Sequence, residues 1–344
     1  MKSIVLTGIR SMEMVEKPIP KISHPGAVLI QMDRVGVCGS DIHYYTDGKI
    51  GSQVVQYPFT VGHEGAGTVC EVGSGVLRIK PGDRVAIDPA MPCFGCDQCL
   101  SGRFHTCRKL LFLGCPGQAE GCLSDYIVMP EHSCFVLPAT MSFDEAVVSE
   151  PLAIGYYATK LAGCLSGKSV GILGFGPIGM SVLLPAIASG ASSTYVTDKI
   201  EERLQMARQS GATWAGNPDI DNIVDEISKR EPLLLDYVFE CCGKQEAADQ
   251  AIKLLKPGGK LLIIGIPEFD YWHFPADDFR RKEIVVQNVR RQNESTSEAL
   301  ELIASGRVDV KPMITHHYPL ENSAIAFENV SNYRDGVMKA MITF

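Results

Sequence analysis

Three residues in the first part of the chain could together hold a catalytic metal ion. Cys38, His63 and Glu64 offer a thiolate, an imidazole and a carboxylate. These are the donors of a zinc site that keeps one coordination position open for substrate. Glu150, in Ser149-Glu150-Pro151, could supply a further ligand from far along the chain. Taken singly, a cysteine and a loop histidine are more often ordinary buried or surface residues, and it is the combination that indicates a metal site.

Four other cysteines have the spacing of a structural zinc site. Cys93, Cys96 and Cys99 follow one another at intervals of three, and Cys107 comes eight positions later. Four thiolates complete a tetrahedral site, so a metal here would fix its loop and leave no position for substrate. The spacing fits neither ferredoxin pattern of iron–sulfur proteins. We expect the other cysteines, which lack such spacing, to be small buried apolar residues: Cys70, Cys115, Cys122, Cys134, Cys164, Cys241 and Cys242.

Composition limits the classes of partner. The chain has 344 residues, 45% hydrophobic and 21% charged, with a net charge of −8. The length favours two domains, and the acidic balance argues against nucleic acid or an anionic membrane as the main partner. No charged residue lies between Lys168 and Asp198, but glycines and prolines divide this stretch into a strand, a turn and a helix rather than a membrane span. The amino-terminal apolar run is too short for a signal peptide, and four cysteines have metal spacing, so we expect a reducing, cytoplasmic setting.

The pattern of elements changes near Pro151. Before it, short apolar runs alternate with Pro-Gly and Gly-Ser pairs, and no helical pattern of any length precedes Ser142, which predicts a β-rich domain. After it, predicted strands at 169–173, 194–197, 233–240, 260–265 and 283–289 alternate with helices ending near 189 and spanning 201–209, 245–255 and 298–305, with a turn at 256–259. Such alternation predicts a parallel sheet with helices on both faces.

A glycine motif follows the first of these strands and opens a helix. Gly174 would allow the tight turn, Gly176 would let backbone approach a pyrophosphate, and Gly179 would let the helix pack closely. Asp198, at the end of the next strand, would accept hydrogen bonds from the ribose and repel a 2′-phosphate, so NAD is preferred over NADP. Arg203 nearby weakens that preference. A structural glycine turn without a ligand is the alternative interpretation.

At this point the sequence resembles the zinc-containing medium-chain dehydrogenase/reductase superfamily, most of all its sorbitol (L-iditol) and xylitol dehydrogenases. The likeness runs nearly from end to end. The motifs that carry it are residues 36–44 (Gly-Val-Cys-Gly-Ser-Asp-Ile-His-Tyr), Gly62-His63-Glu64, Glu150-Pro151, residues 176–180 (Gly-Pro-Ile-Gly-Met), and Val310-Lys311-Pro312 with Thr315-His316. The resemblance implies an α/β chain in which a GroES-like catalytic domain, residues 1–152 and 290–344, is interrupted by a Rossmann domain, residues 153–289, with the active site in the cleft between them.

The resemblance also implies roles for single residues. Cys38, His63 and Glu64 match catalytic zinc ligands, and Glu150 matches a glutamate that ligates zinc or holds the metal-bound water. Ser40 and His43 match a proton relay, and Asp41 matches the partner of the zinc-bound histidine. Tyr44, Glu150, Arg290 and the adjacent Arg291 are the substrate candidates. The positions along NAD are Gly174, Gly176, Pro177, Ile178, Gly179, Asp198, Arg203, Gly265 and Ile266.

Ordinary explanations exist for several of these residues. His43 could be a solvated loop histidine, Tyr44 could be simple packing, and the two arginines could pair with acidic surface groups. The chain also departs from the family pattern. Its four-cysteine lobe is complete, Cys241-Cys242-Gly243 replaces Cys-Thr-Gly, and Arg291 stands where an aromatic residue is expected. The extra cation leaves room for a sugar acid or a sugar phosphate.

The expected activity is reversible oxidation of a secondary alcohol of a polyol or sugar-derived substrate to a ketone. NAD would accept the hydride, with one catalytic and one structural zinc per chain; the catalytic zinc would act as a Lewis acid on the hydroxyl. The alternatives are a zinc dehydrogenase for a sugar acid, a sugar alcohol phosphate or threonine, and a nucleotide- or zinc-binding protein without catalysis. A homodimer or homotetramer is expected.

Overall fold

The computed structural model describes all 344 residues, and they form two compact units. Unit 1 consists of Met1–Glu150, Thr296–Gly306 and Val310–Phe344, and unit 2 of Pro151–Ser295 and Arg307–Asp309. The chain therefore leaves unit 1 and later returns to it. Residues 290–295, which the sequence analysis assigns to the catalytic domain, belong to unit 2. The expected domain bounds, 1–152 with 290–344 and 153–289, stay a prediction.

Unit 1 is built on a seven-stranded sheet. Its order is β11-β7-β6-β3-β19-β18, and β10 also pairs with β3. The strands are β3 (Ala27–Gly36), β6 (Glu64–Val72), β7 (Arg84–Ile87), β10 (Tyr126–Pro130), β11 (Cys134–Val136), β18 (Ile314–Pro319) and β19 (Lys339–Thr343). Because β19 pairs antiparallel with β3, the last strand of the chain lies beside an early one.

Small hairpins, several short helices and the first part of the long helix α3 complete unit 1. The paired strands are β1 (Lys2–Gly8) with β2 (Ser11–Glu16), β4 (Lys49–Ile50) with β5 (Gln53–Val54), and β8 (Ala90–Met91) with β9 (Leu111–Phe112). The helices are α1 (Gly39–Thr46), α2 (Asp97–Leu100), α3 (Phe143–Ala162), α9 (Thr296–Ala304) and α10 (Ser323–Ser331), with 3-10 turns η1 (Phe104–Thr106), η2 (Glu131–Ser133), η3 (Lys311–Met313), η4 (Leu320–Asn322) and η5 (Arg334–Gly336). The boundary between the units falls within α3.

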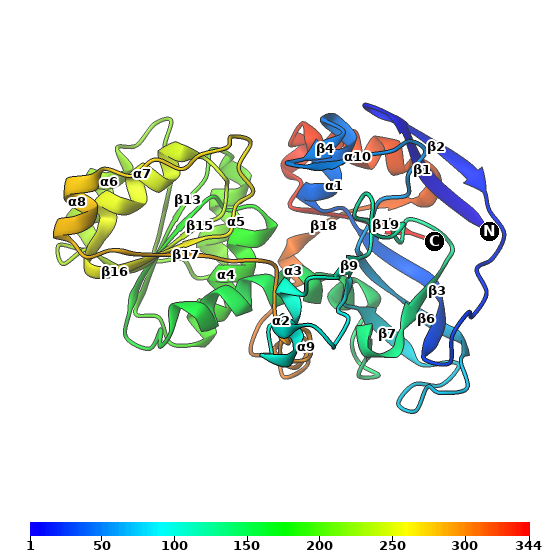
Figure 1. Cartoon of the computed structure of the whole chain (residues 1–344). Helices are drawn as coiled ribbons and strands as arrows, with labels where there is room; N and C mark the ends of the chain where they lie inside the picture. The colour runs from blue at the N-terminus through cyan, green and yellow to red at the C-terminus, as the bar shows by residue number, and fades with distance from the viewer. The chain divides into compact units, whose positions relative to one another are not determined.

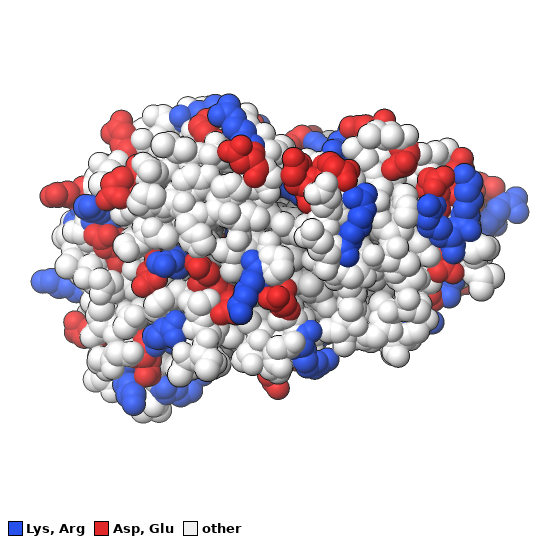
Figure 2. Space-filling view, turned by 180° about the vertical axis from the view of Figure 1, so that it is seen from behind, with Lys and Arg blue, Asp and Glu red and all other residues white.

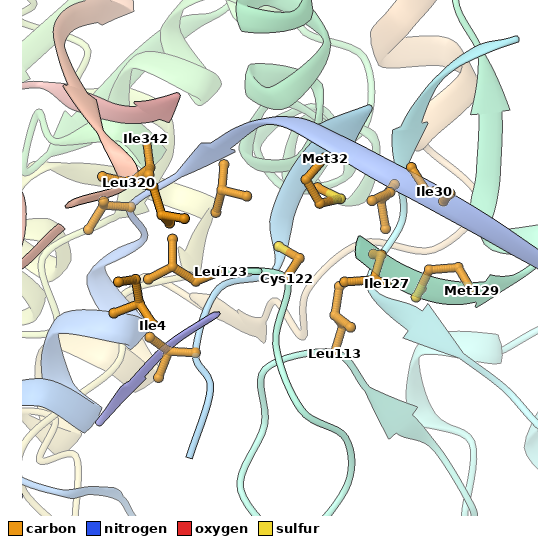
Figure 3. Close-up of a cluster of buried hydrophobic side chains, with 14 of the residues drawn as sticks. Ile4, Ile30, Met32, Leu113, Cys122, Leu123, Ile127, Met129, Leu320 and Ile342 are labelled. Carbon is orange, nitrogen blue, oxygen red and sulfur yellow. The ribbon is translucent and has the colours of Figure 1, made fainter. Parts of the chain in front are cut away.

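The core of unit 1 joins strands that are distant in the sequence. Figure 3 shows Ile4 of β1, Met32 of β3, Met129 of β10 and Ile342 of β19 among the buried side chains of one cluster. Burial of this apolar surface is the main term that holds such strands together. It therefore fixes the ends of β3 and β6, from which the metal-binding candidates come.

The β-rich character predicted before Pro151 is confirmed, but the stretch before Ser142, in which no helical pattern was found, does contain a helix: α1 covers Gly39–Thr46. Two turns of helix are marginal in isolation and give little periodic signal. Tertiary contacts stabilise this one: Tyr44 and Tyr45 are buried, and the Tyr45 hydroxyl donates to Glu328 of α10 at 2.9 Å. The four-residue α2 is missed for the same reason.

Unit 2 is a doubly wound domain. Its sheet has the order β14-β13-β12-β15-β16-β17, and every pairing is parallel. The strands are β12 (Ser169–Leu173), β13 (Ser193–Thr197), β14 (Trp214–Gly216), β15 (Leu235–Glu240), β16 (Leu255–Ile263) and β17 (Val285–Asn288); the helices are α4 (Pro177–Ala188), α5 (Glu201–Gln209), α6 (Ile223–Arg230), α7 (Gln245–Leu254) and α8 (Ala276–Arg281). Helices α6 and α7 lie together on one face and α4 lies on the other (Figure 1). This order is that of dinucleotide-binding folds, and the predicted fold class is confirmed.

The expected turn at 256–259 is wrong in detail. These residues lie inside β16, where Leu255 pairs with Leu235 and Lys260 pairs with Tyr237. Five positions on β16 thus span two on β15, so Pro-Gly-Gly forms a bulge within the strand instead of ending it.

The cysteines outside the metal-spaced groups are not all buried. Cys115, Cys122 and Cys134 are buried as expected. The expectation is wrong for the others: Cys70, Cys164 and Cys242 are exposed and Cys241 is half-buried. A small thiol is tolerated at a strand edge or loop, so residue type alone does not place it.

The uncharged stretch between Lys168 and Asp198 folds as β12, α4 and β13. No helix of the structure combines the length and the apolar character that crossing a membrane requires. On the face drawn in Figure 2, acidic and basic side chains are interspersed. Basic residues there do not merge into a continuous strip of the kind that tracks a nucleic-acid backbone.

Candidate active site

The antiparallel pairing of β3 and β6 brings the three metal-binding candidates together. Gly36, the last residue of β3, pairs with Glu64, the first residue of β6. Cys38 follows β3 by two positions and His63 precedes β6 by one, so both side chains come from the same end of this strand pair. The ligand atoms of Cys38, His63 and Glu64 all lie within 4.8 Å of one another.

Asp41 orients the imidazole ring of His63. It is fully buried, and its Oδ1 lies 3.3 Å from His63 Nδ1. The same carboxylate accepts hydrogen bonds from the backbone N–H groups of Cys38 and Gly62, both at 3.2 Å. Although burial opposes the charged imidazole, the negative charges of Asp41 and Cys38 raise the pKa of His63. With Nδ1 facing Asp41, Nε2 is the ring nitrogen left for a metal.

Glu64 has a partner that the sequence reading did not anticipate. Lys339 Nζ, from β19, donates to both carboxylate oxygens of Glu64 at 2.7 Å, and each side chain is only 1% exposed. Lys339 was missed, although a signal existed. It stands alone between apolar residues of a strand, where a lysine is seldom buried unless it is paired.

Glu150 is a buried carboxylate with unused hydrogen-bonding capacity. It is 6% exposed, and its Oε2 has no hydrogen-bond partner. Burial, with Glu64 and Asp88 nearby, raises the pKa of Glu150 to about 7, while His63 and Lys339 oppose the rise. Glu150 is not one of the three residues whose ligand atoms lie within 4.8 Å of one another. A thiolate, an imidazole, a carboxylate and an unpartnered buried oxygen nearby are donors that fit zinc.

The other substrate and relay candidates of unit 1 lie on α1. Ser40 Oγ donates to Cys38 Sγ at 3.4 Å, next to the metal donors. His43 is partly exposed, and its Nδ1 lies 3.5 Å from Asp47 Oδ2. Tyr44 is buried, and its hydroxyl donates to Gln53 Oε1 at 3.2 Å. One turn of helix therefore runs from the metal donors to a histidine in contact with solvent.

The four metal-spaced cysteines converge within one loop. The sulfur atoms of Cys93, Cys96, Cys99 and Cys107 lie within 4.8 Å of one another. Backbone N–H groups donate to these sulfurs, among them that of Arg108 to Cys96 at 3.5 Å. Bonds from the backbone of Cys99 and Arg108 lower the pKa of Cys96 to about 6, whereas burial raises that of Cys99 to about 12. Four sulfurs so placed fit a closed tetrahedral zinc site.

The glycine turn of unit 2 has the geometry that its motif predicts. Gly174 has a φ of 95°, which favours glycine. A Cβ on Gly179 would lie 2.1 Å from Gly174 O, so only glycine lets α4 approach this closely. Gly176 precedes Pro177 at the start of α4 and supplies no side-chain cap. The first amides of the helix thus have no side-chain acceptor, as an anion-binding terminus requires.

Asp198 and Arg203 lie beside this turn. Asp198 Oδ2 accepts from Phe175 N–H at 2.7 Å and Oδ1 from Ile200 N–H at 2.9 Å. Arg203 is mostly buried, with its guanidinium 3.9 Å from Asp198. The carboxylate therefore braces the turn itself, besides standing at the end of β13 where a ribose is expected.

Two further segments pack against the turn at the carboxyl ends of β15 and β16. Cβ of Cys242 would be 2.7 Å from a Cβ on Gly174, and a Cβ on Gly265 would lie 2.1 Å from Gly243 N. Glu240, missed by the sequence reading, is buried and accepts hydrogen bonds from the backbone N–H groups of Cys242 and Gly243. In the sequence, the available signal was a glutamate at the end of an apolar run that predicts a strand.

The remaining candidates also lie in unit 2. Ile178 is half-buried and Ile266 is 45% exposed. Arg290 is exposed, and Arg291 is half-buried with a φ of 54°. A left-handed backbone is uncommon for arginine and is over-represented at functional sites.

Known proteins share this arrangement over the whole chain. Residues 24–139 match the model of the alcohol dehydrogenase GroES-like domain, and residues 177–305 match that of the zinc-binding dehydrogenase domain. Sorbitol dehydrogenase of Bacillus subtilis is 34% identical over 99% of this chain and 97% of its own length.

Solved structures agree. Galactitol-1-phosphate dehydrogenase of Escherichia coli has a TM-score of 0.92 and 28% identity over 100% of both chains. A candidate zinc-binding dehydrogenase of Sinorhizobium meliloti, crystallised with NADP, has the same TM-score and identity over 100% of this chain and 99% of its own. Taken with the donor set of unit 1 and the glycine turn of unit 2, these matches show that the chain belongs to the zinc-containing medium-chain dehydrogenase/reductase superfamily, in its sorbitol dehydrogenase branch.

Proposed function

We propose that this chain oxidises a secondary alcohol of a polyol or sugar-derived substrate to a ketone, reversibly, with NAD as hydride acceptor. The observation that carries the proposal is the group formed by Cys38, His63 and Glu64, whose ligand atoms lie within 4.8 Å of one another in a buried setting. It occurs in a chain whose other unit carries a dinucleotide-type glycine turn, and metal-assisted hydride transfer from an alcohol to NAD uses both.

The residues of unit 1 would divide the work between holding the metal and handling the proton. Cys38, His63 and Glu64 would bind zinc, with Glu150 as a further ligand or the holder of a water. When bound, the metal supplies Lewis acidity that lowers the pKa of a substrate hydroxyl. Ser40 Oγ would accept the hydroxyl proton while releasing its own, and His43 would pass a proton to solvent. In the metal-free protein, burial raises the pKa of Glu150 to about 7, and a bound cation would favour its ionised form.

In unit 2, Gly174, Gly176, Pro177, Ile178 and Gly179 would bind the dinucleotide at the start of α4. Asp198, Arg203, Gly265 and Ile266 would line the rest of its path. The structural support is the bare amino terminus of α4 and the close approach that Gly179 permits. The four-cysteine loop would hold a second, structural zinc.

Relatives give the substrate class. The Bacillus subtilis protein is a sorbitol dehydrogenase, which favours a neutral polyol. Tyr44, Glu150, Arg290 and Arg291 are the proposed substrate contacts. Arg291 supports a second candidate, a sugar alcohol phosphate or sugar acid, because it adds a cation beside Arg290; galactitol-1-phosphate dehydrogenase is among the similar structures.

A panel of substrates tests the proposal. The zinc-loaded protein is mixed with NAD and polyols, aldonates, sugar alcohol phosphates or threonine, and NADH absorbance is followed. Turnover with polyols is expected. Turnover confined to phosphates or aldonates would select the second candidate, and no turnover with any of them despite two bound zinc ions would favour a nucleotide- or zinc-binding protein.

Cofactor preference can be tested at Asp198. Asp198→Ala should raise the ratio of NADP to NAD use, because it removes a negative charge that repels a 2′-phosphate. Asp198→Asn is the second variant: it also removes the charge, but its amide oxygen can still accept from one of the two backbone N–H groups, of Phe175 and Ile200, that Asp198 binds. Steady-state kcat/KM with each cofactor measures the ratio, and an unchanged ratio in both variants would contradict the assignment.

We further propose a homodimer or homotetramer in the cytoplasm. Strand β17 supports association, because it lies at the edge of the sheet of unit 2 and its Val285 is 49% exposed. Edge strands are common pairing surfaces. Light scattering of the pure protein would show the oligomeric state. The metal spacing of four cysteines supports a reducing compartment.

A further inference from the structure

Lys339 contacts the metal-binding region, but the resemblance to known dehydrogenases implied no role for it. It is 1% exposed and lies in β19. Its ammonium donates to both oxygens of Glu64 at 2.7 Å and to Val37 O at 3.3 Å. A lysine loses much hydration when it is buried this deeply, so its placement needs a specific electrostatic reason.

The carboxylate of Glu64 has little freedom to move away from Lys339. A Cβ on Gly36 would lie 2.3 Å from Glu64 Oε2 and 2.8 Å from Val147 Cγ1. The strand pair β3 and β6 holds Gly36 directly opposite Glu64. Glycine thus makes room for the carboxylate on one side, and the ammonium holds it on the other.

Both oxygens of Glu64 therefore share their negative charge with an ammonium, although the ligand atoms of Cys38 and His63 are within 4.8 Å. A carboxylate shared in this way is a weaker metal ligand than a free one. Catalytic zinc sites differ from structural ones in keeping a coordination position that substrate can take. A ligand weakened by a neighbouring cation would provide such a position.

We propose that Lys339 is a positioning residue that weakens Glu64 as a metal ligand and so keeps one coordination position of the catalytic metal exchangeable. The proposal rests on the metal site of the proposed function. It assigns to Lys339 no contact with substrate or cofactor. Its action passes through Glu64.

Removal of the ammonium should make the fold depend on the metal. In Lys339→Met, the Glu64 carboxylate of the metal-free protein is left buried without its cation, which is strongly unfavourable. A bound divalent ion replaces the lost positive charge, so the metal-loaded protein should lose much less stability. By linkage, the affinity for the metal must rise by the same free energy.

The experiment measures metal release and thermal stability with zinc as the probe. Zinc leaving the protein into excess chelator is followed, and the release phase that is missing in Cys38→Ser is assigned to this site. We expect that phase to be about 10-fold slower in Lys339→Met than in the wild type, because the competing ammonium is gone; this change corresponds to about 1.4 kcal/mol. We also expect the difference in Tm between the zinc-loaded and metal-free forms to be larger in Lys339→Met.

Three matched variants separate this role from ordinary packing. Lys339→Arg keeps the positive charge and should release zinc at the wild-type rate. Glu64→Gln/Lys339→Met removes both charges and should abolish the extra dependence of Tm on zinc. Lys260→Met removes another partly buried lysine, one whose Nζ donates to carbonyls of Leu161 and Ala162; it should lower the Tm of both forms equally.

The outcomes are distinct. An unchanged release phase in Lys339→Met, or equal losses of Tm in its zinc-loaded and metal-free forms, would overturn the proposal. Failure of that variant to fold even with zinc would also count against it, because the metal should compensate for the lost cation. If the wild type has no release phase that Cys38→Ser removes, the proposed metal site itself is wrong, and the inference falls with it.

Discussion

The two groups of metal-binding side chains are assembled in different ways. Cys93, Cys96, Cys99 and Cys107 come from one loop, and backbone N–H groups of that loop surround their sulfurs. The group of Cys38, His63 and Glu64 is built where β3 ends and β6 begins, and charged residues of α1 and β19 contact it. These are Asp41 at His63 and Lys339 at Glu64. One loop is therefore enough to bring the four sulfurs together, whereas the other group has charged partners that the whole fold brings to it.

The largest expected effect separates the two groups by function. His63→Ala should lower kcat/KM by about 10³-fold or more, because it removes a donor to the catalytic metal, while NADH binding is retained. Cys99→Ser should lower Tm by about 5 °C or more through loss of the structural metal. The kcat of Cys99→Ser per folded molecule should stay within the same order of magnitude as that of the wild type. Kinetics, NADH fluorescence and thermal melts on both variants check this, and exchanged phenotypes would reverse the two assignments.

A smaller effect should follow from loosening the support of His63. Asp41→Asn keeps the shape of the side chain but removes its negative charge, so His63 Nδ1 loses its charged acceptor. Loss of such a partner typically costs 10- to 100-fold in metal affinity or activity, and about that range is expected here. Zinc titration and kcat are the measurements. Asp97→Asn, beside the four-cysteine group, is the control and should leave both unchanged.

The pH dependence of stability should reveal Glu150 in the metal-free protein. Because burial in the folded state raises its pKa to about 7 from the usual 4.5, its contribution to stability is present below about pH 4.5 and is lost as pH rises through about 7. Glutamine does not ionise, so Glu150→Gln should not show this loss of stability. The two proteins should therefore diverge in free energy of unfolding between these pH values, by denaturant titration. Parallel curves would contradict the assignment, and zinc should reduce the divergence.

The smallest effect is expected at the surface of the four-cysteine loop. Arg108 pairs with Asp97 through two hydrogen bonds, of 2.5 and 2.8 Å, and both side chains are more than half exposed. Exposed pairs contribute little because solvent and salt screen them. Arg108→Ala should change Tm by no more than about 2 °C. A large fall in Tm would mean that this loop, like the other site, depends on a charged partner.

The sequence could predict features whose signals are local. The strand, glycine turn and helix around Gly174 follow from a motif in which each glycine has a steric reason, and Gly179 in particular proves to face Gly174 O. The four cysteines are similar, since their spacing alone limits how far apart they can lie. Helix α1 gave no such signal, because two turns are too short for periodicity and owe their stability to residues such as Glu328, far along the chain.

By itself, the sequence determined the donor types, the two kinds of fold and the glycine turn, because each depends on residues close together in the chain or on a repeating pattern of burial. Only the tertiary structure decided that Lys339 holds Glu64, whereas the contact of Asp41 with His63 was already implied by the resemblance. The strength of an ion pair depends on the distance in space between the two charges, which the fold sets. Lys339 reaches its partner only because β19 lies next to β3, a pairing that no local pattern encodes.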